Sequence, residues 1–229
     1  MKSAGWTDAE IEVFETAHIE QLVVVEPTSP GVAPWLENQL RAIATPIKKA
    51  MHSRGYHAHE KVLLGIDPIA GVSATMTNVI MTDEGIVSVS AFLFRWCGLI
   101  ARAYLRTLNL DVRAWSEGHA NTLSDKERLK ARPDLALYWF RIFLSFATTG
   151  THHKVPYRPS TKYELVHFEQ VAWAMEFFAV GHEFAHHALG HRAVGDDLHQ
   201  QEFEADSLSL VISEMLDVEP WGGLRQSVC

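Results

Sequence analysis

The most informative stretch of the chain is Gly181-His182-Glu183-Phe184-Ala185-His186, in which two histidines stand four residues apart with a glutamate between them. On an α-helix, residues four apart lie on one face, so both imidazoles of this stretch can reach a single metal ion. Glu183 is rotated by about 100° from His182 around the helix axis. From there it can take a proton from a zinc-activated water without binding the ion itself. The pattern therefore predicts a zinc site with His182 and His186 as ligands and Glu183 as the general base.

The helix that carries this motif is expected over residues 163–189. An apolar run over residues 171–180 precedes the motif, and Gly190 follows the helix, as is typical of a helix C-terminus. A helix buried in this way can hold a rigid site from which water is largely excluded. Because the chain has 13 histidines, the plain alternative is a helical structural protein whose histidines belong to the core or the surface.

A zinc site of this kind needs a third protein ligand, and His191, Glu202 and Glu204 are the candidates. His191 follows His182 by nine residues, one short of the spacing in zinc proteases with three histidines. Glu202 and Asp206 are four residues apart and share a helix face. Glu202 can therefore bind the ion while Asp206 accepts a hydrogen bond from a ligand histidine. Glu204 points to about the opposite side, so Glu202 is favoured; the alternative is an acidic face exposed to solvent.

The predicted fold class is α+β, mainly helical and zincin-like, with a small antiparallel sheet and the motif on the active-site helix. Residues 73–81 and 86–90 are rich in β-branched side chains and flank Asp83-Glu84-Gly85. This spacing is typical of a hairpin with Gly85 at positive φ. Residues 62–66 predict a further short strand. Helices are expected from Thr7 and over residues 35–54, 91–108, 134–147, 163–189 and 197–216.

Three parts are predicted along the chain. A helical N-terminal segment, residues 1–60, packs on a zincin-like metallopeptidase domain, residues 61–221, and residues 222–229 form a tail.

The composition narrows the classes of function. Lys and Arg number 20 against 28 Asp and Glu, which gives a formal net charge of -8 and argues against nucleic acid as a partner. No run approaches the roughly 18 uncharged apolar residues of a membrane span, and residues 1–15 lack the apolar core of a signal peptide. Of the two cysteines, Cys97 lies in an apolar run, and we expect it to be a buried free thiol. We therefore expect a soluble cytoplasmic protein without a disulfide framework.

The motif residues resemble those of the gluzincin zinc metallopeptidases. Residues 182–191 resemble the active-site helix of the CAAX prenyl protease and HtpX group, and Glu202-Phe203-Glu204-Ala205-Asp206 resembles its glutamate helix. The short connection between the two helices is more similar to the soluble ImmA/IrrE or Lit-type peptidases. The resemblance covers residues 163–216.

This resemblance implies a soluble zinc-dependent endopeptidase with one zinc ion. His182, His186 and Glu202 would bind the ion, Glu183 would be the general base, and Asp206 would support a ligand histidine. A protein or peptide substrate would lie along an edge strand, for which the hairpin at residues 73–90 is the candidate. The alternative is a non-catalytic, zinc-bound regulatory or interaction module. Glu183 argues against that alternative, because a purely structural site needs no base.

Overall fold

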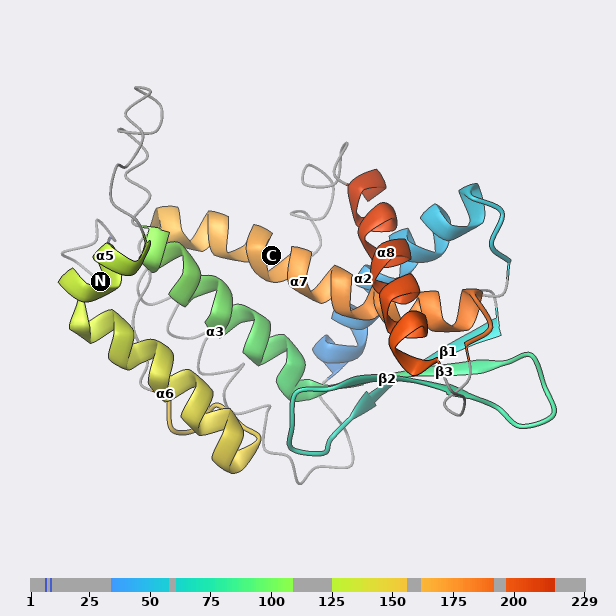
Figure 1. Ribbon diagram of the computed structural model, residues 1–229, viewed down its shortest axis with the longest axis horizontal. Helices are drawn as coiled ribbons and strands as arrows, with labels where there is room; N and C mark the ends of the chain where they lie inside the picture. The colour runs from blue at the N-terminus through green and yellow to red at the C-terminus, as the bar shows by residue number, and fades with distance from the viewer. Residues whose placement is uncertain are drawn as a thin grey trace. The chain divides into compact units, whose positions relative to one another are not determined.

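The protein is mainly helical and has one small mixed sheet among its described residues (Figure 1). The computed structural model describes residues 34–57, 61–108, 125–155, 162–191 and 197–216, together with Thr7 and Ala9. The helices predicted over residues 35–54, 91–108, 134–147, 163–189 and 197–216 are confirmed. Most of the helix expected from Thr7, and all of the tail at residues 222–229, lie outside the described residues.

The chain forms two compact units. The first comprises Met1–Thr28, Ile69–Val72 and Phe92–Trp173, and the second comprises Ser29–Pro68, Ser73–Ala91 and Ala174–Cys229. The motif and its candidate partners all lie in the second unit. Its elements are α2 (Pro34–Ser53), β1 (Val62–Asp67), β2 (Ala74–Asn78), β3 (Gly85–Ser90), the C-terminal part of α7 (Lys162–Ala188) and α8 (Leu198–Leu216).

The sheet has the strand order β1-β3-β2, with β3 in the centre. β3 pairs antiparallel with β2, as the predicted hairpin requires, and parallel with β1. The sheet is therefore mixed, and the prediction of an antiparallel sheet was wrong. The hairpin forms from neighbouring segments, whereas β1 joins β3 through a non-local contact. The central position suits β3 because Val87 and Val89 are fully buried there.

The turn of the hairpin also differs from the prediction. Met81, with φ 65°, is the residue at positive φ, whereas Gly85 is the first residue of β3. The reason is a longer connection than expected: the amide of Val79 donates to the carbonyl of Glu84, and the amide of Thr82 donates to the carbonyl of Val79. The left-handed residue therefore falls inside the loop.

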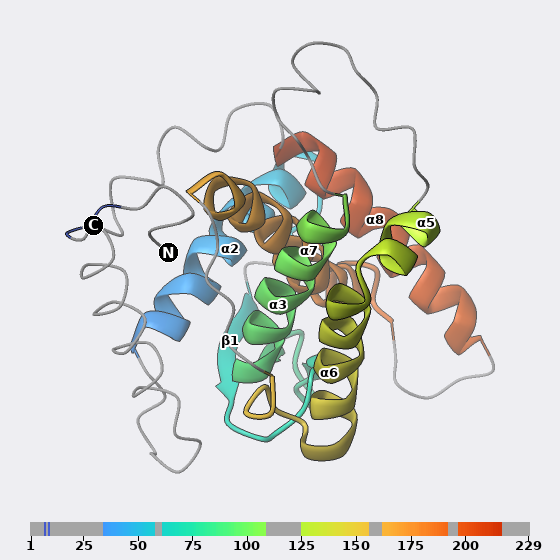
Figure 2. The ribbon, with the colours of Figure 1, turned by 90° about the vertical axis from the view of Figure 1, so that its left-hand side faces the viewer.

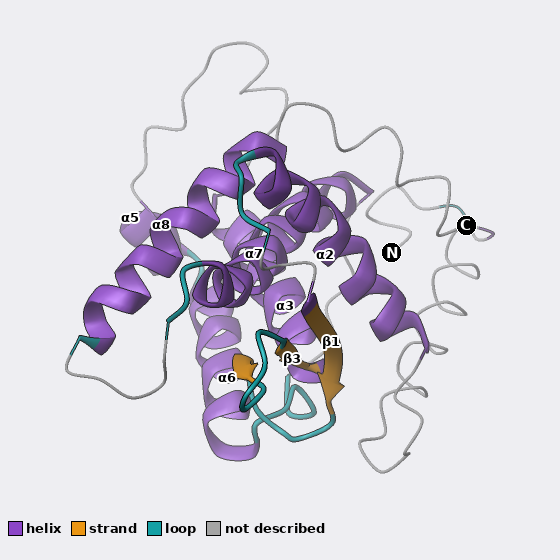
Figure 3. Ribbon diagram, turned by 90° about the vertical axis from the view of Figure 1, so that its right-hand side faces the viewer, coloured by secondary structure: helices purple, strands orange, loops and turns teal. Residues whose placement is uncertain are grey.

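Helix α2 supports this unit through a buried stripe, and it contacts both α8 and β1 (Figure 3). The stripe recurs every three to four residues, which places its members on one helix face. Its members are Leu36, Leu40, Ile43, Ile47 and Met51.

Helices α7 and α8 approach closely at the motif because the residues between them are small. A Cβ atom at Gly181 would lie 2.8 Å from Oγ of Ser209, and that hydroxyl donates to the carbonyl of Phe178 at 2.8 Å. Ala185 and Ala205 are fully buried. The side chains of α8 can therefore reach the histidines of α7.

The first unit contains α3 (Ala91–Leu108), α5 (Asp125–Ala131), α6 (Pro133–Thr149) and the N-terminal part of α7. Helices α3 and α6 lie side by side (Figure 2). Nε1 of Trp139 donates to Oγ1 of Thr107 at 2.8 Å, and Trp96 packs edge-to-face on Phe146. Cys97 is a buried free thiol, as predicted. Within the described part of the chain, no helix combines the length and the hydropathy needed to cross a bilayer.

Candidate metal centre

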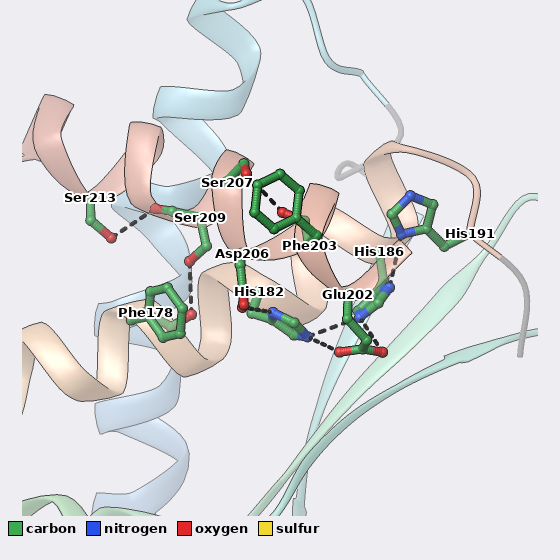
Figure 4. Close-up of polar contacts among 10 residues, drawn as sticks. All are labelled: Phe178, His182, His186, His191, Glu202, Phe203, Asp206, Ser207, Ser209 and Ser213. Carbon is green, nitrogen blue, oxygen red and sulfur yellow. Dashed lines mark hydrogen bonds and ion pairs between the residues drawn. The ribbon is translucent and has the colours of Figure 1, made fainter. Parts of the chain in front are cut away.

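Three side chains from two helices converge at the motif (Figure 4). Nε2 of His182 and Nε2 of His186 lie 2.9 Å apart. The Glu202 carboxylate approaches from α8, with one oxygen 3.1 Å from Nε2 of His182 and the other 3.5 Å from Nε2 of His186. Among the described residues, this is the group of His and acidic side chains that could hold a metal ion.

The spacing of these donors fits a small metal ion. Two ligand atoms at about 2.0–2.1 Å from a tetrahedral ion are separated by roughly 3.3 Å. The three separations of 2.9, 3.1 and 3.5 Å fall on either side of that value. The two Glu202 distances run to different oxygens, but one ligand atom from each of the three side chains lies within 4.8 Å of the others, so one ion could contact all three.

The hydrogen bonding of His182 also favours a cation at this point. Its Nδ1 lies 2.8 Å from Oδ1 of Asp206, and a carboxylate can only accept. Nδ1 of His182 is therefore the donor in this hydrogen bond, and in the neutral ring a lone pair is left at Nε2. That lone pair faces the Glu202 carboxylate, which is also an acceptor. Two acceptors in contact repel each other, and a metal ion bound between them would remove that repulsion, so the donor set fits a metal ion.

Burial favours the neutral form of His186, because burial lowers the pKa of its imidazole. The neighbouring His182 lowers this pKa further, whereas Glu202 raises it. A neutral imidazole is the form that binds metal. His186 therefore suits the role of a ligand.

Glu183 lies beside this cluster but outside it, in a more buried environment. Only 9% of the residue is exposed. Burial raises the pKa of its carboxyl group and is the largest effect. His182 lowers this pKa and Glu202 raises it, while a hydrogen bond from the backbone amide of Met76 lowers it, and the net result is a raised pKa. A carboxylate with a raised pKa is a stronger base.

The bond from Met76 ties Glu183 to the edge of the sheet. The amide of Ser90 donates to the carbonyl of Ser73, and the amide of Val79 donates to that of Glu84. Because inward and outward backbone groups alternate along an antiparallel strand, Met76 directs its amide away from β3. Among the described strands, β2 is an edge strand, and its free edge therefore faces the motif helix. The sequence carries no signal for this contact, because a backbone amide supplies it.

The other two ligand candidates lie away from the cluster. Nδ1 of His191 is 2.9 Å from Nδ1 of His186, behind that ring, and Nε2 of His191 is 3.1 Å from Oε2 of Glu204. His187, which the sequence places in the same histidine cluster, is buried and faces the hairpin instead. Its Nδ1 lies 3.5 Å from Oδ1 of Asn78.

Because His187 lies against the hairpin, position 85 has no room for a side chain, and we expect that only glycine is tolerated there without strain. A Cβ atom there would lie 2.9 Å from Nδ1 of His187 and would overlap Cε of Met76. We expect Gly85→Ala to lower the free energy of unfolding by about 1–3 kcal/mol, the usual cost of overpacking, measured by urea denaturation. Gly65→Ala is the matched control, because a Cβ atom at Gly65 in β1 meets no atom within 4 Å. Equal losses in both variants would contradict this interpretation.

Comparison with protein-family models, with curated proteins and with solved structures finds no match to this chain. The resemblance to the gluzincins therefore rests on the motif residues alone.

Proposed function

We propose that this protein is a zinc-dependent endopeptidase of the gluzincin type. His182, His186 and Glu202 would hold one zinc ion, since two imidazoles and one carboxylate form a typical donor set for catalytic zinc. A zinc ion bound there would supply Lewis acidity, which activates a water molecule and polarises a carbonyl group.

Glu183 would act as the general base. Its carboxylate lies close enough to His182 and Glu202 for both side chains to affect its pKa. Burial makes the carboxylate more basic, and the hydrogen bond from the Met76 amide only partly offsets that effect. After accepting a proton from water, Glu183 can pass that proton to the departing amine.

The substrate would be an extended polypeptide segment along the free edge of β2. Pairing with an edge strand binds main chain in a conformation that folded proteins rarely expose, so unstructured segments are the preferred class. The link from Met76 to Glu183 would align that main chain with the base.

The observation that carries this proposal is the burial of Glu183 between an edge strand and the three-donor cluster. A site that only fastens two helices would gain nothing from a buried carboxylate outside the ligand set. Such a carboxylate costs desolvation free energy, and base catalysis gives a reason for it.

The test combines metal content with hydrolysis. We expect the purified protein to bind one zinc ion and to cleave an unstructured protein, with cleavage lost on chelation and restored by zinc. His186→Ala should lose both properties, whereas His199→Ala, which changes an exposed histidine near the start of α8, should keep both. New N-termini are detected by mass spectrometry. Zinc binding without any cleavage would support the non-catalytic module instead.

A further inference from the structure

The C-terminus of α7 turns His191 back onto the metal-binding histidines. Gly190 has φ 69°, the left-handed conformation that glycine adopts at low cost. The amide of His191 donates to the carbonyl of His186 at 2.9 Å, and the amide of Gly190 donates to that of His187 at 3.1 Å. These two bonds define a Schellman motif. It brings the His191 ring over the last turn of the helix, beside His186.

The His191 ring bridges a ligand and an acid. Its side chain is only 8% exposed. Nδ1 lies 2.9 Å from Nδ1 of His186, and Nε2 lies 3.1 Å from Oε2 of Glu204. The other oxygen of Glu204 accepts from Nε2 of Gln200 at 2.8 Å. Glu204 is therefore held in place from both sides.

The direction of these hydrogen bonds follows from what each atom can donate. A carboxylate only accepts, so Nε2 of His191 carries the proton that Glu204 receives. In the neutral ring, Nδ1 of His191 is left with a lone pair and can accept the Nδ1 proton of His186. His186 is left with a lone pair at Nε2, the atom that faces His182 and Glu202.

We propose that His191 and Glu204 are positioning residues, which fix the tautomer and orientation of His186 so that its Nε2 is ready to bind the metal ion. Asp206 does the same for His182 through a single bond. This inference rests on the proposed metal site, and it assigns to both residues a task other than ligation. Partners of this kind around metal ligands change metal affinity by about 10–100-fold.

The first measurement needs no metal. With ¹⁵N-labelled histidine, the metal-free protein at about pH 8, where histidine is neutral, should show His186 protonated on Nδ1. His191→Phe removes the acceptor while keeping a planar ring, and His186 should then shift towards protonation on Nε2. His191→Gln offers a carbonyl oxygen as acceptor and should restore the parent tautomer. An unchanged His186 tautomer in His191→Phe would overturn the proposal.

The second measurement is zinc affinity by competition with a chelating indicator. We expect His191→Phe to bind zinc about 10–100-fold more weakly than the parent, with His191→Gln close to the parent. His199→Phe, an exposed position on α8, is the control for loss of a nearby histidine and should not change affinity. Parent affinity in His191→Phe would contradict the positioning role while leaving the metal site intact.

Glu204→Ala tests the same hydrogen-bond chain at a position where a folding defect is not expected, because the Glu204 side chain is 45% exposed. This variant should fold normally, lose the fixed tautomer of His191 and bind zinc several-fold more weakly. An unchanged tautomer and an unchanged affinity together would overturn the proposal. Absence of zinc binding by the parent would instead overturn the proposed function, and the tautomers of the metal-free protein would still decide the role of His191.

Discussion

Glu183→Gln is expected to lower peptide hydrolysis by a factor of about 10²–10⁴, the usual contribution of a general base, while zinc binding stays at the parent level. The glutamine amide can still accept the hydrogen bond from Met76, so the local geometry is preserved. It cannot take a proton at neutral pH. Hydrolysis of an unstructured protein, measured on zinc-loaded samples, checks this result.

A second variant separates the base from the ligands. Glu202→Gln should lose zinc affinity and hydrolysis together, because this carboxylate belongs to the donor cluster. Glu183→Gln should also be at least as stable as the parent, since burial raises the pKa of Glu183 and the amide carries no charge to desolvate. A stable, zinc-loaded Glu183→Gln protein with parent activity would refute the proposed mechanism.

Glu176→Gln is expected to stabilise the protein, and increasingly so at higher pH. Glu176 lies on α7 and is 3% exposed. Burial raises its pKa from 4.5 to about 8, against the smaller effect of the hydrogen bond from Gln39 at 2.8 Å. The folded protein therefore keeps a proton that the unfolded chain releases.

The direction of the effect follows from these proton counts. Between about pH 4.5 and pH 8 the folded state binds more protons than the unfolded state, so the stability of the parent falls as pH rises. Glutamine removes this dependence and still accepts from Gln39. The gain over the parent should grow by about 2.5 kcal/mol from pH 5 to pH 7 and by about 1.4 kcal/mol more by pH 9.

Urea denaturation with a chelator present measures this gain without a contribution from metal binding. Glu214→Gln, an exposed position on α8, is the matched control and should change the free energy of unfolding by less than about 0.5 kcal/mol at each pH. A gain from Glu176→Gln that does not vary with pH would show that Glu176 is ionised in the folded protein.

Local patterns determined much of this protein from its sequence. The helices follow from apolar periodicity and from terminators such as Gly190. The convergence of His182 and His186 follows from a spacing of four on one helix, which needs no knowledge of the rest of the fold. The pair Glu202 and Asp206 follows in the same way, and the structure places both carboxylates against His182.

Tertiary structure alone decided the features that join distant segments. The parallel pairing of β1 with β3, the bond from Met76 to Glu183 and the burial of Glu176 all depend on which elements meet. Glu204 illustrates the limit: helical geometry places it away from Glu202, yet it reaches His191 because a Schellman turn brings that ring to it. Spacing along a helix predicts contacts within that helix, but a contact between elements depends on the packing of the whole unit, which no single segment encodes.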